Sequence, residues 1–538
     1  MTKLSRSLVL GCSVLALSAC GPEDLANLGS NGNITINNPA APAPTPTPTP
    51  TSTLVTAAPG CPTIADPQGL TDAGTITGPT GTWRVCTLPR VIRASSTLPR
   101  IAGVLYQLNG RVDVGCDGGF SVPTAGAPHA TSTVGCPSAT LTADTNVNLT
   151  IEPGVIVYGG TGQSWLAVNR GNKVTANGTA ARPIVFTSRD NVLGLNTNSS
   201  QGQWGGIVLM GRAPTTDCTT GTVAAGTCER QTEGSADPAR FGGANAADNS
   251  GRLSYVQIRY SGFILGSGVE LQALTTEAIG SGTTLDHIQS VNSSDDGAEF
   301  FGGSVNMKYY IAAGADDDSL DVDTGAQMNV QYALLSQRSG RGDALFEIDS
   351  NGNEADTPRT TLKVANFTAI QQAASSDNEA ADQASALFRG NSDTTLINGV
   401  FFAPNNECIR MNGTGTTPAT LTARSVVLSC NATKFIGTGT GASAYTAASV
   451  ATAFGSGANN NSDAFTSTLT SLYINGANET GVAAADPKTF ASFFDTTTWI
   501  GAVRNTSDNW WSTWTCNSDV ADFGTANTGA CTTLPVFS

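Results

Sequence analysis

The chain carries little charge and is poor in histidine and lysine, two side chains that often transfer protons in active sites. Charged residues make up 13% of its 538 residues, against about 25% in an average globular domain, and there are two histidines, His129 and His287. Acidic residues outnumber basic ones by 42 to 27, a net charge of −15. Nucleic-acid binding needs clustered Lys and Arg, and the sequence has no Walker-type phosphate loop. We therefore expect neither nucleic acid nor nucleotide as a partner.

Long hydrophobic runs are also missing, apart from a short one near the N-terminus. Residues 8–17 follow a positively charged start and are too few to span a bilayer, which takes about 20 residues. The run ends in small residues before Cys20, which resembles the bacterial lipobox and predicts a signal peptide over 1–19 with lipidation of Cys20. Cleavage of an ordinary secretory signal near Ala19 is the alternative. Because Gly21 replaces the Asp of an inner-membrane retention signal, we expect a lipid anchor in the outer membrane, on its periplasmic or cell-surface face.

A segment rich in proline and threonine follows the predicted lipid anchor. From Pro39 the chain reads PAAPAPTPTPTPTSTL. Repeated proline blocks both helices and strand ladders, so a polyproline-like spacer of about 3.1 Å per residue is expected. We assign residues 20–60 to this tether, which holds the following domain away from the lipid.

The cysteines indicate an oxidising compartment. Two of the twelve, Cys12 and Cys20, belong to the signal peptide and the lipid anchor, and an even number in an exported protein indicates disulfides. The other ten form five sequence-local pairs, which is the connectivity we favour: Cys61–Cys86, Cys116–Cys136, Cys218–Cys228, Cys408–Cys430 and Cys516–Cys531. A zinc site would need CxxC spacing or histidine partners, which the sequence lacks.

Short runs with alternating apolar residues recur through most of the chain. The clearest runs are LSYVQIRYSG from Leu253, LDHIQSVNSS from Leu285, VNMKYYIAAG from Val305, MNVQYALLSQ from Met328, LKVANFTAIQ from Leu362, TTLINGVFFA from Thr394 and LTARSVVLSC from Leu421. Alternation predicts strands with one buried face, and successive runs start 32, 20, 23, 34, 32 and 27 residues apart. A variable period with a minimum near 20 favours an all-β, parallel β-helix solenoid over a propeller, a sandwich or a helical solenoid.

Several longer motifs resemble a family of exported or lipid-anchored bacterial proteins with a single-stranded right-handed parallel β-helix, the pectate-lyase-like superfold. They are LTIEPGVIVYGG (149–160), LAVNRGNKVTANGTAARPIVFTS (166–188), WGGIVLMGRA (204–213), the acidic stretch 294–325, WIGAV (499–503) and NWWSTW (509–514). The family is largely uncharacterised. The resemblance therefore implies the fold and export, and it implies no activity.

We divide the exported part of the chain into three regions. Residues 61–140 form a disulfide-bonded N-terminal region with the first coil, 141–500 form the β-helix, and 501–538 form a C-terminal cap. The capping role rests on tryptophans beside the last cysteine pair, because an uncovered final coil exposes strand edges and apolar side chains. These are Trp499, Trp510, Trp511 and Trp514. A sugar-stacking platform is the alternative role for this group.

Acidic residues are concentrated between positions 295 and 349. When DDGAEFFGG (295–303) is aligned with DDSLDVDTG (317–325), Asp296 matches Asp318 and Glu299 matches Asp321, an offset of 22. Asp343 follows 25 residues after Asp318. One coil per offset places these carboxylates about 4.8 Å apart, the spacing of neighbouring strands.

Like charges at that spacing repel, so a buried ladder needs a cation, an arginine or a raised pKa. Arg338 and Arg341 follow on the next coil. Ca²⁺ is the candidate cation, because calcium takes oxygen ligands only. The candidate ligands are Asp296, Asp318, Asp321 and Asp343, with Asp349, Asn351 and Asn353 from the loop DSNGNEAD. Solvated strand edges and Asx-type turns are the alternative.

We expect a rigid surface module that binds or adheres to a glycan or a cell-surface protein, with the membrane as a partner through the lipid. The alternative is a polysaccharide lyase or glycoside hydrolase acting on acidic glycans in the groove. A hydrolase needs two carboxyl groups, for which Asp295, Asp296 and Asp318 are candidates. A lyase needs a basic residue, with Lys308, Arg338 and Arg341 as the choices. Since neither the histidine motif of polygalacturonases nor the basic set of pectate lyases is recognisable, we assign no catalytic residue.

Overall fold

A computed structural model describes residues 54–537, except 236, 267–268, 351–354, 375–383 and 414–416. Residues 54–538 form one compact unit. The predicted signal peptide, Cys20 and the proline-rich tether up to residue 53 lie outside the described residues. None of the helices within the described ranges has the length and apolar character that crossing a membrane requires.

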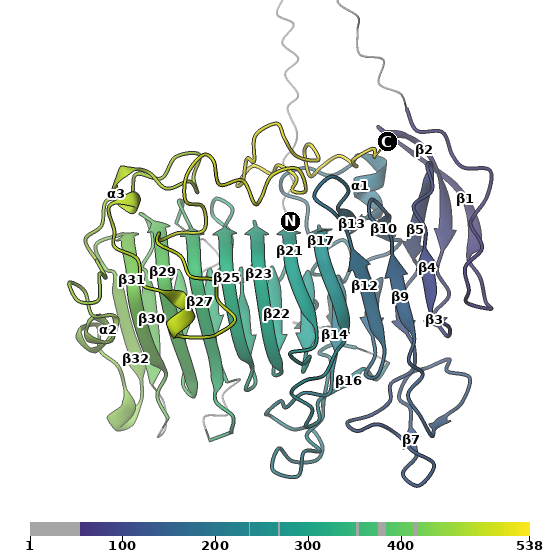
Figure 1. Cartoon of the computed structure of the whole chain (residues 1–538), viewed down its shortest axis with the longest axis horizontal. Coiled ribbons are helices and arrows are strands. Elements are labelled where there is room, and N and C mark those ends of the chain that lie inside the picture. The colour runs from purple at the N-terminus through teal and green to yellow at the C-terminus, as the bar shows by residue number, and fades with distance from the viewer. Residues whose placement is uncertain are drawn as a thin grey trace, which may run out of the picture. The chain divides into compact units, whose positions relative to one another are not determined.

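Two long sheets run side by side through this unit (Figure 1). Sheet A contains β1 (Thr71–Gly78), β2 (Gly81–Thr87), β4 (Ser96–Leu98), β5 (Val104–Leu108), β9 (Asn148–Ile151), β10 (Ile156–Gly159), β12 (Lys173–Asn177), β13 (Ile184–Ser188), β17 (Gly251–Arg259), β21 (Thr284–Val291), β23 (Ser304–Ala313), β25 (Gln327–Ser336), β27 (Thr360–Ile370), β29 (Ser392–Ala403) and β31 (Thr420–Cys430). Sheet B contains β3 (Val91–Ile92), β6 (Arg111–Val114), β11 (Trp165–Val168), β14 (Ile207–Met210), β20 (Leu274–Glu277), β22 (Ala298–Phe301), β24 (Asp321–Asp323), β26 (Phe346–Ile348), β28 (Ala386–Phe388), β30 (Ile409–Gly413) and β32 (Phe435–Gly439).

The remaining elements lie in loops and at the C-terminal end. Three two-stranded ribbons are formed by β7 (His129–Ala130) with β8 (Thr140–Leu141), β15 (Arg230–Gln231) with β16 (Arg240–Phe241), and β18 (Ile264–Gly266) with β19 (Val269–Glu270). The helices are α1 (Arg189–Leu193), α2 (Ala447–Phe454) and α3 (Ala477–Thr480), with 3₁₀ turns at Gly441–Ser443 and Pro487–Thr489.

The arrangement is the predicted parallel β-helix. Each coil from β17 onward gives one strand to sheet A and one to sheet B, and these strands pair in parallel with their counterparts on the following coil. All seven runs predicted from alternation form strands of sheet A. Their inward side chains, such as Val256 and Ile258, are fully buried in the continuous core.

The ten cysteines form the five predicted pairs. The bonds are Cys61–Cys86, Cys116–Cys136, Cys218–Cys228, Cys408–Cys430 and Cys516–Cys531. Each bond closes a loop of 10 to 25 residues, so the bonds secure local loops and do not cross-link distant coils.

The last coil is covered by α2, and the tryptophan-rich segment lies elsewhere. Val450 and Phe454 of α2 join the core beside Phe435 of β32. The parallel ladder ends at Gly439, earlier than the expected residue 500. The expectation that residues 501–538 close the open end therefore needs correction.

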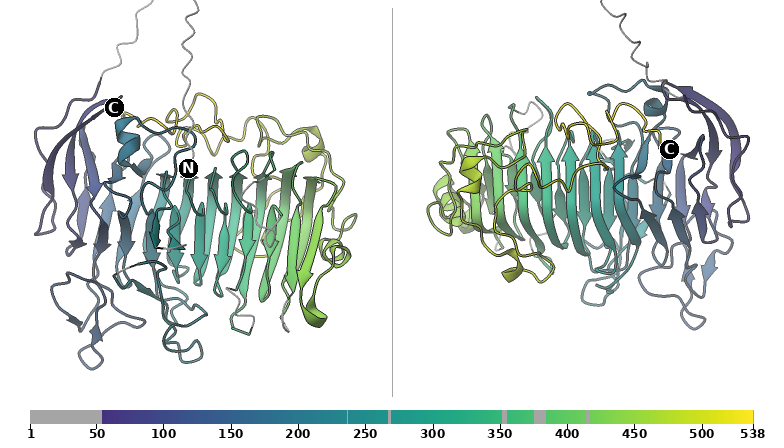
Figure 2. Two further views of the ribbon diagram at one scale, coloured as in Figure 1. Left: turned by 180° about the vertical axis from the view of Figure 1, so that it is seen from behind. Right: turned by 45° about the horizontal axis from the view of Figure 1, so that its top comes forward.

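Residues 455–537, which we call the C-terminal strap, run back over the outer side of sheet A (Figures 1 and 2). A bridge joins Ser462 to Val427 on β31. At the other end, Arg100 beside β4 donates a hydrogen bond to the carbonyl of Phe537. The strap thus passes along the β-helix from its last coils to its first, and the tryptophans lie on this path.

Candidate cation site on sheet B

The carboxylates of the predicted ladder meet on the outer face of sheet B. Glu299 on β22 is opposite Asp321 on β24, which is opposite Glu347 on β26. The offset of 22 between Glu299 and Asp321 is therefore the structural register. Neighbouring residues on these strands, such as Phe300 and Val322, point into the core, so alternation directs the carboxylates outward.

The turns that lead into these strands add a second row of carboxylates. The backbone N–H of Asp318 donates to Oδ1 of Asp296 over 2.8 Å, and the N–H of Ala344 donates to Oδ1 of Asp318 over 2.7 Å. Asp296 and Asp318 thus occupy equivalent places on successive coils. Asp343 lies opposite Asp317, since its N–H donates to the carbonyl of Asp317.

Three groups of carboxylates bring their oxygens close enough to share one cation. The oxygens lie within 4.8 Å of one another in Asp295–Asp296–Asp317, in Asp296–Glu299–Asp321 and in Asp317–Asp318–Asp343. Of the predicted ligands, Asp296 and Asp321 meet in the second group, and Asp318 and Asp343 meet in the third. We call the second group, which belongs to both rows, the central triad.

Burial makes ionisation of these groups costly. Asp296, Asp318 and Glu299 are 4%, 4% and 8% exposed. Burial, reinforced by the neighbouring carboxylates, raises the pKa of each well above its usual range. Burial also raises the pKa of Asp323 to about 8 and that of Glu347 to about 7, although Arg389 beside Glu347 opposes the second shift.

Arginines neutralise the margins of this surface. Arg338 and Arg341 are 3.1 and 3.4 Å from Asp316, so the predicted arginines compensate this residue. Arg389 pairs with Glu347 at 3.0 Å and with Asp349 at 2.9 Å. Because Asp349 already has this arginine partner, the hypothesis that the loop DSNGNEAD binds calcium is weakened. The other ligands proposed from this loop, Asn351 and Asn353, lie outside the described residues.

The central triad has no such compensation. Among the described residues, no arginine, lysine or histidine forms an ion pair with Asp296, Glu299 or Asp321, and Oδ1 of Asp321 is buried without a hydrogen-bond partner. Calcium takes six to eight oxygen ligands at about 2.3–2.6 Å. A triad of carboxylates that supplies oxygens from two adjacent coils fits such an ion, with water completing the shell.

Lys308, one of the three basic residues considered for lyase chemistry, lies on sheet A and is not available to this site. Lys308 lies on β23 and pairs with Asp495 of the strap at 2.8 Å. Its ammonium group also lies 5.0 Å from the ring of Phe493. Lys308 therefore fastens the strap on another face, away from the carboxylates.

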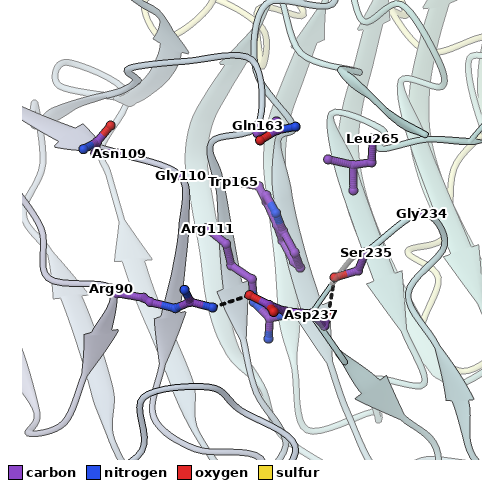
Figure 3. Close-up of a pocket in the computed structure, with 10 residues that line it drawn as sticks. All are labelled: Arg90, Asn109, Gly110, Arg111, Gln163, Trp165, Gly234, Ser235, Asp237 and Leu265. Carbon is purple, nitrogen blue, oxygen red and sulfur yellow. Dashed lines mark hydrogen bonds and ion pairs between the residues drawn. The ribbon is translucent and has the colours of Figure 1, made fainter.

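Two features of sheet B escaped the sequence analysis. Glu277 on β20 is fully buried beside Phe301, in the same column as Asp323. A cavity of about 260 Å³ lies over the first coils (Figure 3), which we call the sheet B cavity. Its lining residues are Arg90, Asn109, Gly110, Arg111, Gln163, Trp165, Gly234, Ser235, Asp237 and Leu265. They come from five separate segments of the chain, so no single sequence motif predicts the cavity.

A match to a family model supports the architecture. A family model described as a pectate-lyase like beta helix domain matches residues 137–487. A solved structure, the tailspike protein of Acinetobacter baumannii phage AM24, is similar over 61% of this chain with 10% identity and a TM-score of 0.22. The chain covers about half, 47%, of that tailspike. No curated protein matches the chain.

Proposed function

The chain belongs to the pectate-lyase-like β-helix domain family, and we propose that it is an exported module that binds an acidic glycan through divalent cations held on sheet B. One observation carries this proposal: three carboxylates, Asp296, Glu299 and Asp321, gather their oxygens within 4.8 Å without a basic partner among the described residues. A cation relieves their repulsion and keeps open positions for an anionic ligand.

The choice of glycan follows from the chemistry of the surface. A face lined by carboxylates repels an acidic polymer unless cations bridge the two. A partly coordinated Ca²⁺ accepts further oxygens from uronate carboxylates or hydroxyls. The family description names pectate, so polygalacturonate is the first acidic glycan to test.

The metal test compares thermal unfolding in calcium and in EDTA. Calcium that binds only the folded chain raises its stability by about 2.7 kcal/mol at a hundredfold excess over Kd, so we expect a higher Tm in calcium. Asp321→Asn removes one ligand and one unit of repulsion, and should abolish the calcium shift while matching or exceeding the wild-type Tm in EDTA. Asp519→Asn, an exposed change on the strap, is the control and should keep the shift. A wild-type Tm that ignores both calcium and EDTA contradicts the cation site.

The binding test uses polygalacturonate on the full chain. We expect binding in calcium, at least tenfold weaker binding in EDTA, and the same loss in Asp321→Asn. Binding that is equally strong with EDTA removes the cation from the proposal. Calcium-dependent melting without any polygalacturonate binding keeps the metal and rejects this glycan.

A hydrolase is the second candidate, because the register places Glu299 beside Asp321. Retaining glycosidases hold two carboxyl groups about 5–5.5 Å apart, one of them protonated. The raised pKa of Glu299, due first to burial and then to Asp321, suits a proton donor. Release of reducing ends that persists in EDTA and disappears in Glu299→Gln favours this candidate, whereas a cation module shows no turnover.

We infer an extracytoplasmic location from the five disulfides, which form in oxidising compartments. The lipobox-like sequence before Cys20 supports anchoring in the outer membrane. Cys20→Ala should release the protein into soluble fractions or leave it unprocessed. Unchanged partitioning into membranes in that variant argues against lipidation.

A further inference from the structure

We propose that one corner of the β-helix, close to the point where the predicted tether joins it, docks on the surface of a phospholipid bilayer. The corner carries four exposed aliphatic side chains, Leu54, Ile101, Leu195 and Val536, which we call the apolar corner. The proposal goes beyond the cation module, because none of these residues belongs to sheet B or to the carboxylate groups. It takes from the proposed function only the lipid anchor, which would bring a bilayer to this end of the chain.

Exposed aliphatic side chains are unevenly distributed over the β-helix. Seven large hydrophobic side chains are exposed among the described residues, and four of them form the apolar corner, with 37% to 63% of their surface accessible. Single exposed side chains of this kind are ordinary, whereas a group of them on one side of a protein marks an interaction surface. Side chains that enter the interface between lipid and water lose contact with water, which stabilises docking.

Two of the four residues lie beside one turn, residues 79–80, which leads into β2. The N–H of Val55 donates to the second carbonyl of this turn over 2.8 Å, so Leu54 lies next to the turn. Gly194, directly before Leu195, packs against the proline of the same turn. The start of the described chain and the residue that follows α1 therefore come to the same place.

The other two residues are joined by a contact of the strap. Arg100, directly before Ile101, donates a hydrogen bond to the carbonyl of Phe537, which follows Val536. Phe537 and Val55 both pack against one apolar cluster on the outer face of sheet A, so the two pairs lie on the same side of the β-helix. Figure 1 shows the C-terminus beside α1 and β2.

A packed base holds the apolar corner in place. The cluster beneath it contains Trp83 of β2, Leu105 of β5, Val192 of α1 and Leu534 of the strap, all of them buried. Because these four elements pack on one another, the exposed side chains above them are presented together. Such a preorganised group loses little conformational freedom when it docks.

The distribution of charge indicates which end of the β-helix faces the lipid. Residues 54–210, which form the first coils, contain nine basic and seven acidic residues, whereas residues 211–538 contain 16 basic and 33 acidic ones. The net charges of the two parts are therefore +2 and −17. A bilayer that contains anionic lipids repels acidic coils within about one Debye length, roughly 10 Å. The first coils are the part that can approach it.

This orientation leaves the carboxylate face in water. The central triad lies on β22 and β24, and β22 is five strand spacings, about 24 Å, from β3 at the start of sheet B. That distance exceeds two Debye lengths, so the bilayer does not disturb the cations proposed there. The expectation that the tether holds the domain away from the lipid then applies to the later, acidic coils.

The experiment measures flotation of the protein with lipid vesicles in EDTA. The protein is the chain from residue 20 onward with Cys20→Ala, which carries no acyl chain, and the vesicles contain phosphatidylethanolamine and phosphatidylglycerol. We expect binding, and at least fivefold weaker binding when Leu195→Ser is combined with Val536→Ser. Val122→Ser combined with Val134→Ser, two exposed valines in the Cys116–Cys136 loop, is the matched control and should leave binding unchanged.

Each outcome decides the inference. No vesicle binding by the parent protein, equal binding by the Leu195/Val536 double variant, or an equal loss in the Val122/Val134 double variant overturns it. A dimer that dissociates in the Leu195/Val536 variant, without vesicle binding, assigns the corner to a second copy and also overturns it. Since the replaced side chains are exposed, an unchanged Tm shows that lost binding is local. The protein carries neither an acyl chain nor calcium, so the result is independent of Cys20 lipidation and of the cation site.

Discussion

At the residue scale, buried ionisable groups divide into those with an opposite charge beside them and those without. Asp117 is fully buried, yet Arg170 at 2.7 Å outweighs the effect of burial, and the pKa of Asp117 lies below its usual range. Arg170 also pairs with Glu229 at 2.6 Å, so it links the Cys116–Cys136 loop with the residue that follows Cys228. Asp296 and Glu299 have no such partner among the described residues. A buried carboxyl group with a raised pKa and no basic partner is a candidate for a functional site.

Glu277 should make the stability of the protein depend on pH. It is 1% exposed, accepts a hydrogen bond from Thr232 at 2.7 Å, and its pKa is raised by burial to about 8. The unfolded chain loses this proton near its ordinary value of 4.5, so the folded state holds more protons between about 4.5 and 8. The stabilisation is therefore complete below pH 4.5 and is lost as pH rises through 8.

Glu277→Gln removes this titration while keeping the acceptor for Thr232. We expect the variant to melt a few degrees above the wild type at pH 9 and to show a smaller fall in Tm between pH 5 and pH 9. Thermal unfolding followed by circular dichroism measures both. Asp519→Asn, an exposed change on the strap, is the control. A wild-type pH profile in Glu277→Gln means that Glu277 does not carry the dependence.

The spacing of the acidic residues predicted part of the carboxylate site. The remaining register and the burial of the carboxylates became known only from the structure. The 22-residue repeat placed Glu299 opposite Asp321 correctly, because both coils have the same length. The next coil is longer: Asp321 pairs with Glu347, 26 positions on, which places Asp343 opposite Asp317 and not Asp318. Sequence spacing also does not tell whether a carboxylate is exposed, and that determines whether it needs a cation.

At the scale of single elements, the long strands of sheet A are bent at one shared position. Seven aligned residues have φ between +50° and +64°: Tyr255, His287, Tyr309, Tyr332, Asn366, Asn398 and Ser425. His287 stacks between Tyr255 and Tyr309, with ring centroids 4.1 and 4.3 Å apart. The alternation of apolar residues does not reveal this bend, because an aromatic residue gives no signal for a left-handed conformation. Asn366 and Asn398, at the same position of later strands, do give such a signal, because Asn adopts the left-handed conformation more readily than most residues.

Asn398 should be sensitive to both its backbone and its side chain. Its φ is +53°, and its amide donates to the carbonyl of Ala485 and accepts from the N–H of Ala485. Asn398→Ala loses these hydrogen bonds and strains the backbone, at a cost of about 2–4 kcal/mol. Asn398→Gly loses the hydrogen bonds but tolerates the φ, so it should cost about 1–2 kcal/mol less.

Chemical denaturation of the two variants measures the difference. Asn505→Ala, an exposed Asn on the strap, controls for the loss of an amide. Equal midpoints for the alanine and glycine variants indicate that the positive φ carries no strain. Wild-type midpoints for both indicate that the contact with Ala485 is not needed for stability.

At the scale of the whole β-helix, the strap changes how the coils depend on each other. In a solenoid each coil contacts only its neighbours, so unfolding spreads from the ends. Here buried amides on separate coils hold the backbone of one continuous segment. The donors and their acceptor carbonyls are Gln257 with Trp514, Gln289 with Cys516, Gln331 with Asp495 and Asn366 with Trp499. The strap therefore couples coils that do not touch one another.

The strap was the part of the fold least accessible from sequence. Repeating alternation marks a strand because its buried face is periodic, whereas residues 455–537 contact sheet A through irregular clusters. Their hydrogen bonds run from side-chain amides to backbone carbonyls, which any residue provides. Tryptophans near the end of a solenoid therefore suggested a cap, although the structure places Trp514 on the bent strands beside Tyr255 and His287.

Coupling through the strap can be tested at Gln289. Its amide donates to the carbonyl of Cys516 and accepts from the N–H of Cys516, both over 2.9 Å. Gln289→Ala removes two buried hydrogen bonds, about 2 kcal/mol, so strap opening should become roughly thirtyfold more frequent. Amide hydrogen exchange should then accelerate along the strap and also on distant coils of sheet A, because one segment holds them all. Gln68→Ala, which breaks the hydrogen bond from Gln68 to the carbonyl of Val91 away from the strap, should leave those amides protected. Faster exchange confined to the residues around Cys516 means that each coil holds the strap independently and that the β-helix unfolds from its ends like an ordinary solenoid.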